Sequence, residues 1–208
     1  PNKKHTFNYV ALGDSYTVGE AVHPLDSWPA QLTQSLLDDD FDINLIATIA
    51  QSGWTTLDLV EQGLPQFEKL EHIDLVTIQI GTNDWVKQVN ASIYRQRLGQ
   101  IMDTVLESVP EAASVIVLTL PDFSASPNGY LYAHGRDIPS GIQSFNQIIQ
   151  EEAGQRGISI VDVFTLSQGM HENPQLVAAD SLHPSAEEYA LWVEKIKPSV
   201  IEYITSDQ

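Results

Sequence analysis

A serine near the start of the chain and an aspartate–histidine pair near its end have the side chains that nucleophilic catalysis needs. Ser15 stands in Gly13-Asp14-Ser15 directly after an apolar run, and the pair stands in Asp180-Ser181-Leu182-His183-Pro184. A serine hydroxyl is almost never ionised near neutral pH, so it attacks a carbonyl only when a base removes its proton. We therefore predict that Ser15 is a nucleophile, that His183 is its general base and that Asp180 orients the histidine.

Short apolar runs alternate with longer amphipathic stretches along the chain that must position these residues. This alternation is typical of βαβ units, in which helices cover both faces of a parallel sheet. Five strands are predicted, at residues 7–12, 42–49, 74–80, 114–120 and 158–163. Helices are predicted at about 27–37, 91–108 and 139–155, with a last helix from about 185. The predicted fold class is α/β, a three-layer α/β/α sandwich with a five-stranded parallel sheet, and we expect a single domain over residues 1–208.

Two local patterns occur in the last predicted helix. Ser185 and Glu188 have the spacing of a capping box, in which each side chain bonds to the backbone N–H of the other residue. Pro198 lies within the apolar pattern of this helix, and proline has no N–H for the helical ladder. We therefore expect Pro198 to kink or interrupt the helix.

Candidate site residues follow each of the first three predicted strands. Ser15 follows the first strand, Gly53 the second and Asn83 the third, while Asp180 and His183 precede the last helix. In an open parallel sheet, the loops at the carboxyl ends of the strands line the ligand crevice. We therefore expect these four sites to converge at one edge of the sheet.

A long loop and two tryptophans are the candidates for contact with a substrate. Residues 121–137 form an irregular segment after the fourth strand, and loops of this length often bind a ligand. We interpret the segment as a substrate loop, with a surface excursion as the alternative. Trp54 and Trp85 each lie close after a candidate site residue, and we assign both to the wall of the substrate pocket. The alternative for the tryptophans is packing in the core.

Taken together, these motifs resemble the conserved blocks of the SGNH (GDSL) hydrolase superfamily. Gly13-Asp14-Ser15 is similar to its first block, and Gly53 is similar to its second. Gly81-Thr82-Asn83-Asp84 matches its Gly-x-Asn-Asp block, and Asp180-Ser181-Leu182-His183-Pro184 matches its Asp-x-x-His-Pro block. All four blocks are present in order.

This resemblance implies a flavodoxin-like sandwich with strand order 2-1-3-4-5 and the activity of an esterase or acylhydrolase. The substrates would be small-molecule carboxylic esters with short acyl chains or acetylated sugars, cleaved through an acyl-enzyme on Ser15. The backbone N–H groups of Ser15 and Gly53 and the side-chain amide of Asn83 would form the oxyanion hole. Asp14 and Asp84 are interpreted as supporting residues that hold these loops in place.

Other functions would use some of the same residues. An acyltransferase, a lysophospholipase or a thioesterase would use the same triad. A metal-dependent phosphoesterase would need a set of oxygen and nitrogen ligands, for which the candidates are Asp14, Asn83, Asp84, Asp180 and His183. A two-metal site normally needs several histidines, so we expect no metal and no other cofactor. A non-catalytic binding module on the same fold is the remaining alternative.

The composition of the chain excludes several classes of partner. The 208 residues include 28 acidic and 10 basic side chains, a formal net charge of −18, which would repel nucleic acid and anionic membrane surfaces. The absence of cysteine excludes disulfides and thiolate metal sites. No apolar stretch approaches the ~20 residues of a membrane span. The oligomeric state stays open.

The start of the chain and the remaining histidines carry less information. The first residue is Pro1 rather than methionine, which slightly favours a periplasmic or extracellular location over the cytoplasm because an upstream signal segment would have been removed. Histidines outside the motifs are expected to be surface or structural residues, namely His5, His23, His72, His134 and His171.

Overall fold

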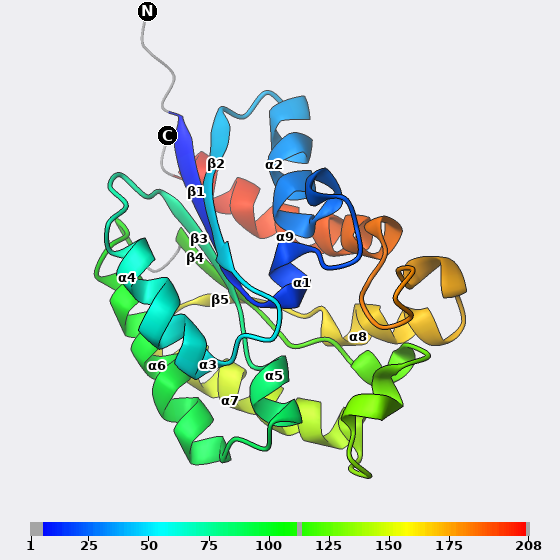
Figure 1. Cartoon of the computed structure of the whole chain (residues 1–208). Coiled ribbons are helices and arrows are strands. Elements are labelled where there is room, and N and C mark those ends of the chain that lie inside the picture. The colour runs from blue at the N-terminus through cyan, green and yellow to red at the C-terminus, as the bar shows by residue number, and fades with distance from the viewer. Residues whose placement is uncertain (1–5, 112–113, 207–208) are drawn as a thin grey trace, which may run out of the picture.

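A five-stranded parallel sheet forms the centre of the protein (Figure 1), for which a computed structural model describes residues 6–111 and 114–206. The strands are β1 (Phe7–Gly13), β2 (Ile43–Ala50), β3 (Leu75–Gln79), β4 (Val115–Leu118) and β5 (Ser159–Val161). Their spatial order is β2-β1-β3-β4-β5, and each neighbouring pair is parallel. The expected fold class and strand order are confirmed.

Ser15 follows β1, the strand at which the order of the strands across the sheet reverses direction. β1 pairs with β2 on one side and with β3 on the other. Gly13, the last residue of β1, is level with Ala50 of β2 and with Gln79 of β3. The loops after these three strands therefore leave the sheet side by side, which is the arrangement that forms a ligand crevice.

Long helices connect the strands, and short ones follow the strand ends. The helices are α1 (Ser15–Val18), α2 (Trp28–Asp38), α3 (Thr56–Asp58), α4 (Leu64–Phe67), α5 (Thr82–Val86), α6 (Ala91–Leu106), α7 (Ile138–Arg156), α8 (Phe164–Ser167) and α9 (Ala186–Ser206). α2, α6 and α7 begin and end within about two residues of their predicted bounds, and α9 begins within one residue of its predicted start. The short ones were not predicted, because three to five residues are too few to display a helical period.

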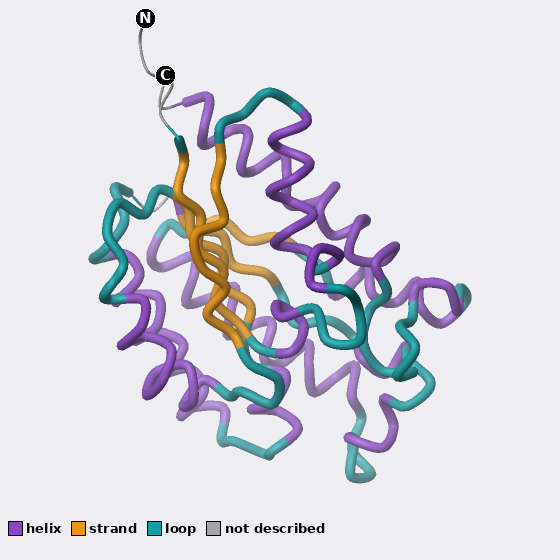
Figure 2. Tube along the Cα trace, turned by 45° about the horizontal axis from the view of Figure 1, so that its top comes forward, coloured by secondary structure: helices purple, strands orange, loops and turns teal. Residues whose placement is uncertain are grey.

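Helices cover both faces of the sheet (Figures 1 and 2). On one face, α2 packs against α9, and its stripe of Trp28, Leu32 and Leu36 is fully buried. On the other face, the core includes residues of α4, α6 and α7. The spacing of the α2 stripe, one apolar residue every four, is the pattern that places a single helix face against a core.

The two local patterns of α9 have different outcomes. The Ser185 hydroxyl accepts a hydrogen bond from the Glu188 N–H at 3.3 Å, whereas the Glu188 carboxylate accepts one from Trp192 Nε1 at 2.8 Å. Only one half of the predicted capping box is therefore formed. The predicted interruption at Pro198 is wrong, because α9 runs through it to Ser206. Buried side chains on both sides of the proline pack into one core and hold the helix together.

Glu188 is a fully buried carboxyl group, and this has a consequence for the stability of the fold. Burial raises its pKa to about 7, although the bond from Trp192 acts in the opposite direction. The folded protein therefore holds this proton more tightly than the unfolded chain. The stabilisation is fully present below the pKa of the unfolded group, and it is lost as the pH rises toward about 7.

Replacement of Glu188 by glutamine is expected to remove this pH dependence while keeping an acceptor for Trp192. The free energy of unfolding of Glu188→Gln, relative to that of the wild type, should rise by on the order of 1–3 kcal/mol between about pH 4 and about pH 8. Urea denaturation at the two pH values measures the difference. The other buried carboxyls titrate equally in both proteins, so a difference that did not change with pH would contradict the prediction.

Candidate active site

Ser15, His183 and Asp180 form a continuous chain of hydrogen bonds at the carboxyl edge of the sheet. His183 Nε2 lies 2.9 Å from Ser15 Oγ, and His183 Nδ1 lies 2.5 Å from Asp180 Oδ2. The exposed fractions of Ser15 and His183 are 6% and 8%, so the pair is shielded from bulk water. The structure brings together the three residues that the sequence predicts, in the order nucleophile, base and orienting carboxylate.

A tight turn fixes the aspartate against the histidine. Asp180 Oδ1 accepts hydrogen bonds from the backbone N–H groups of Leu182 at 2.9 Å and His183 at 3.0 Å. The turn requires a left-handed residue, Ser181, with φ of 62°. Burial opposes the ionisation of Asp180, but the hydrogen bonds from His183 and Leu182 hold its pKa below the usual value. The orienting group is therefore a carboxylate at neutral pH.

The turn after β1 places Ser15 at the first residue of α1. Asp14 caps this helix, because its Oδ1 accepts the N–H of Tyr16 at 3.0 Å. Gly13 permits a close approach here, since an added Cβ would lie 2.1 Å from Thr17 Oγ1. Asp14 is fully buried, and burial raises its pKa to about 7. Its contacts are those of the supporting residue that the sequence predicts.

Gly53 lies on the loop after β2 and Asn83 lies in α5, which follows β3, and both share one cavity with Ser15. Gly53 has φ of 82°, a conformation that glycine adopts without strain. Asn83 is half-buried, and its Nδ2 donates to the Trp54 carbonyl at 3.0 Å. A side-chain amide has two hydrogens, so this bond orients the amide and leaves a second donor for a ligand.

Side chains from two neighbouring segments hold the Gly53 loop. Lys87 Nζ donates to the Gly53 carbonyl at 2.9 Å. Asp84 is fully buried and accepts bonds from the N–H of Thr56 at 2.8 Å and from its hydroxyl at 2.5 Å. On the other side, the Ser52 hydroxyl donates to the Glu20 carboxylate. Burial raises the pKa of Asp84 despite the Thr56 bonds. The loop is therefore fixed to the segments that carry Ser15 and Asn83.

A cavity of about 330 Å³ opens at the triad. It is lined by Ser15, Tyr16, Glu20, Ser52, Gly53, Thr82, Asn83, Val86, Phe123, Tyr132, Leu182 and His183. Sequence reasoning did not find Glu20, Ser52, Val86 or Leu182 as lining residues. In the sequence, only their proximity to the motifs could have indicated that these residues line the cavity. Phe123 and Tyr132, by contrast, belong to the segment 121–137 that the sequence analysis interprets as a substrate loop.

Trp54 and Trp85 do not line this cavity, and their assignment to its wall is corrected. They are 6% and 5% exposed and pack in the core. Residues of a helix are about 100° apart, so Asn83 and Val86 share one face of α5 while Trp85 points elsewhere. Trp85 packs instead beneath the loop at 121–137, where the Arg136 guanidinium lies 3.8 Å from its ring centre.

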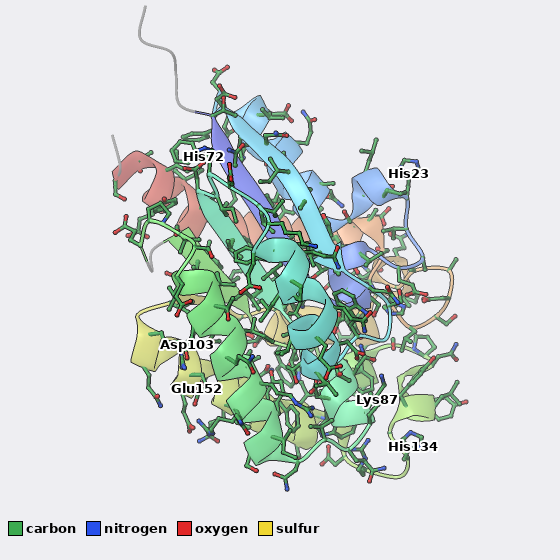
Figure 3. The ribbon with its side chains drawn as sticks, turned by 60° about the vertical axis from the view of Figure 1, so that its left-hand side comes forward. His23, His72, Lys87, Asp103, His134 and Glu152 are labelled. Carbon is green, nitrogen blue, oxygen red and sulfur yellow. The ribbon has the colours of Figure 1, made fainter. Side chains whose placement is uncertain are left out.

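Four of the histidines outside the motifs are exposed and do not line the cavity at the triad. His23, His72 and His134 are exposed and lie far from one another (Figure 3), and His171 is also exposed. The surface interpretation is confirmed for these four, whereas His5 lies outside the described residues.

Within residues 6–111 and 114–206, no cluster of three or more His, Asp or Glu side chains is arranged to hold a metal ion. In the same part of the chain, no helix has the length and apolar character to cross a bilayer.

Comparison with known proteins gives matches over most of the chain. The model of the GDSL-like Lipase/Acylhydrolase family matches residues 11–191. An arylesterase of Vibrio mimicus is 23% identical over 199 residues, which cover 94% of this chain and 88% of the relative. The crystal structure of TesA has a TM-score of 0.74 at 22% identity, covering 94% of this chain and 99% of that one. Axe2, an acetylxylan esterase from Geobacillus stearothermophilus, has a TM-score of 0.71 at 17% identity, with coverages of 95% and 96%. The two structures share the fold of this chain.

Proposed function

The chain belongs to the GDSL-like lipase/acylhydrolase family and is a hydrolase that acts on ester bonds, and from this premise we propose that it cleaves short-chain carboxylic esters through an acyl-enzyme on Ser15. One observation carries the proposal. His183 Nε2 lies 2.9 Å from Ser15 Oγ while Nδ1 bonds to Asp180 at 2.5 Å. This geometry allows the imidazole to remove the serine proton as the hydroxyl attacks.

The first half-reaction transfers the acyl group to the enzyme. Ser15 Oγ attacks the ester carbonyl, and its proton passes to His183 Nε2. Asp180 stabilises the imidazolium that forms and keeps Nδ1 protonated. The tetrahedral intermediate then collapses, its bond to the alcohol oxygen breaks, and His183 gives the proton to the departing alcohol. Ser15 is left as an ester of the acyl group.

The oxyanion of this intermediate needs donors that are fixed before the charge develops. We assign this role to the backbone N–H groups of Ser15 and Gly53 and to Nδ2 of Asn83, which border the same cavity. The bonds from Asn83 to Trp54 and from Lys87 to Gly53 support the assignment, because they fix these donors in advance.

Hydrolysis of the acyl-enzyme completes the cycle. A water molecule attacks the acyl carbonyl, and His183 removes its proton as it did for Ser15. When the second tetrahedral intermediate collapses, the proton returns to Ser15 Oγ and the carboxylic acid leaves. The same groups therefore serve both halves of the reaction.

The size of the cavity supports a preference for small esters. Ligand pockets range over about 300–1,000 Å³, and this one, at about 330 Å³, is near the lower end. The similarity to an arylesterase and to an acetylxylan esterase supports acetyl esters of aryl alcohols or sugars as the substrate class.

Two measurements test the proposed function. Within a series of p-nitrophenyl esters of increasing acyl length, kcat/KM should be highest for the shortest chains. An organophosphonate should add its mass to Ser15 and stop hydrolysis, and EDTA should leave hydrolysis unchanged. The serine mechanism would be contradicted if EDTA abolished the activity and if the organophosphonate left Ser15 unlabelled and the activity intact.

Replacement of Asn83 by alanine is expected to lower kcat by about 10²–10³-fold with little change in KM, because the amide contributes mainly in the transition state. Asn83→Asp should be at least as damaging, since it puts a negative charge beside the oxyanion. Steady-state kinetics on p-nitrophenyl acetate measure both variants. If Asn83→Ala raised KM alone, the residue would bind the ground state instead.

A further inference from the structure

The position of His183 determines on which side of Ser15 the alcohol part of an ester lies, provided that the proposed function is correct. The nitrogen that removes the serine proton also gives it to the leaving oxygen, so that oxygen must come within hydrogen-bond reach of His183 Nε2. The carbonyl oxygen points instead toward Gly53 and Asn83. The alcohol therefore occupies the part of the cavity beside His183.

The loop at 121–137 borders this part of the cavity. Asn128 is tied to the triad segment, because its N–H donates to the Ser181 carbonyl at 2.9 Å and its Nδ2 donates to the Asp180 carbonyl at 3.1 Å. Tyr132 follows within the same turn of 3₁₀ helix, Gly129–Tyr132, and lines the cavity together with Leu182 and His183. The Asn128 bonds hold this short segment against the turn of Asp180 and His183, and on that basis we place Tyr132 on the histidine side of the cavity.

Hydrogen bonds fix the loop at two other points. At its start, the Asp122 N–H donates to Ser167 Oγ at 2.7 Å. At its end, the Arg136 guanidinium donates to the carbonyls of Trp85 at 2.7 Å and Val86 at 3.1 Å. A ring held on such a loop loses little freedom when a ligand packs against it, so its contact contributes more fully to binding.

The chemistry of this side favours an uncharged and flat group. Tyr130, Leu131 and Tyr132 are consecutive and exposed by 69%, 55% and 42%, but of these three only Tyr132 lines the cavity. Neither lysine nor arginine occurs among the described residues that line it, and the acidic Glu20 is bonded to Ser52. A tyrosine ring offers its face for stacking against another flat apolar surface.

We infer that Tyr132 determines leaving-group specificity, by stacking against the flat apolar face of the alcohol part of the ester. Such a face is present on an aryl ring and on one side of a sugar ring, so both kinds of alcohol have the chemistry that Tyr132 recognises. An ester of a small alkyl alcohol lacks this face.

A comparison of esters that share one acetyl group tests the inference. Phenyl acetate and an O-acetylated xylo-oligosaccharide present the flat face, whereas ethyl acetate does not. Tyr132→Ala should lower kcat/KM for one or both of the flat substrates, relative to ethyl acetate, by about three- to tenfold. A fall for phenyl acetate identifies the aryl ring as the partner, and a fall for the oligosaccharide identifies the sugar face. Tyr132→Phe should retain the wild-type ratio of kcat/KM for each flat substrate to kcat/KM for ethyl acetate.

Tyr130→Ala is the matched control, because it removes the same ring from the same turn without a change to the cavity lining. Its ratio should equal that of the wild type. An unchanged ratio in Tyr132→Ala, or an equal fall in Tyr130→Ala, would overturn the inference. A wild-type protein that hydrolysed none of the esters and was not labelled at Ser15 would instead overturn the proposed esterase function and this inference with it.

Discussion

Replacement of Ser15 by alanine is expected to lower kcat/KM for acetyl esters by at least about 10⁴-fold, because in the proposed mechanism this hydroxyl forms the acyl-enzyme. The residual rate would come from substrate binding and the oxyanion donors alone. The fold should persist, since among the described residues the side-chain hydrogen bond of the Ser15 hydroxyl is to His183 alone. Kinetics and urea denaturation of the same preparation measure the two effects together.

Ser144→Ala is the control for the loss of a serine hydroxyl. Ser144 is exposed on α7, and within the described part of the chain its hydroxyl bonds only to the Gly141 carbonyl. This variant should keep wild-type kinetics. The loss of a nucleophile leaves far less than about 1% of the activity. A Ser15→Ala protein that retained more than this fraction would therefore rule out the covalent mechanism.

Replacement of His183 by alanine is the second change with a large expected effect, a fall in kcat/KM of at least about 10³-fold. Without the imidazole, neither the serine nor the water can lose its proton, and the leaving alcohol cannot gain one. Asp180→Ala should lower kcat/KM by a smaller factor, because in the proposed mechanism Asp180 orients the histidine and stabilises its charge but transfers no proton. Steady-state kinetics of the two variants measure this difference.

His134→Ala and His171→Ala serve as controls, because both histidines are exposed and neither lines the cavity. Both variants should hydrolyse acetyl esters at the wild-type rate. If either lost as much activity as His183→Ala, the assignment of the general base would be wrong. A larger loss for Asp180→Ala than for His183→Ala would equally contradict the division of roles between them.

The segments around the triad are connected to one another, as well as being attached to the sheet. Lys87, the residue directly after α5, bonds to the loop that carries Gly53, and Arg136 bonds to the carbonyls at the end of α5. Asn128 connects the loop at 121–137 to the turn of Asp180. These connections fix the relative positions of the proposed nucleophile, base and oxyanion donors before substrate binds, and such preorganisation supplies much of the catalytic advantage of sites of this kind.

Much of this arrangement was predictable because it depends on local patterns. Predicted runs of six to eight residues placed each strand within about two residues at either end, and the helical spacing of apolar side chains placed α6 and α7. The three-residue separation of Asp180 and His183 allows their contact within a single turn. The parallel order of the strands then required the ends of β1, β2 and β3 to lie at one edge.

Local sequence patterns therefore specify the set of strands, the residue types proposed for the triad and the edge of the sheet at which they meet. Packing in three dimensions determines that Trp54 and Trp85 face the core, that Glu188 bonds to Trp192 and that Tyr132 lines the cavity. The physical reason is the range of the interactions. Backbone conformation and apolar periodicity depend on near neighbours in the chain, whereas the direction of a side chain depends on the packing of segments that lie far apart in the sequence.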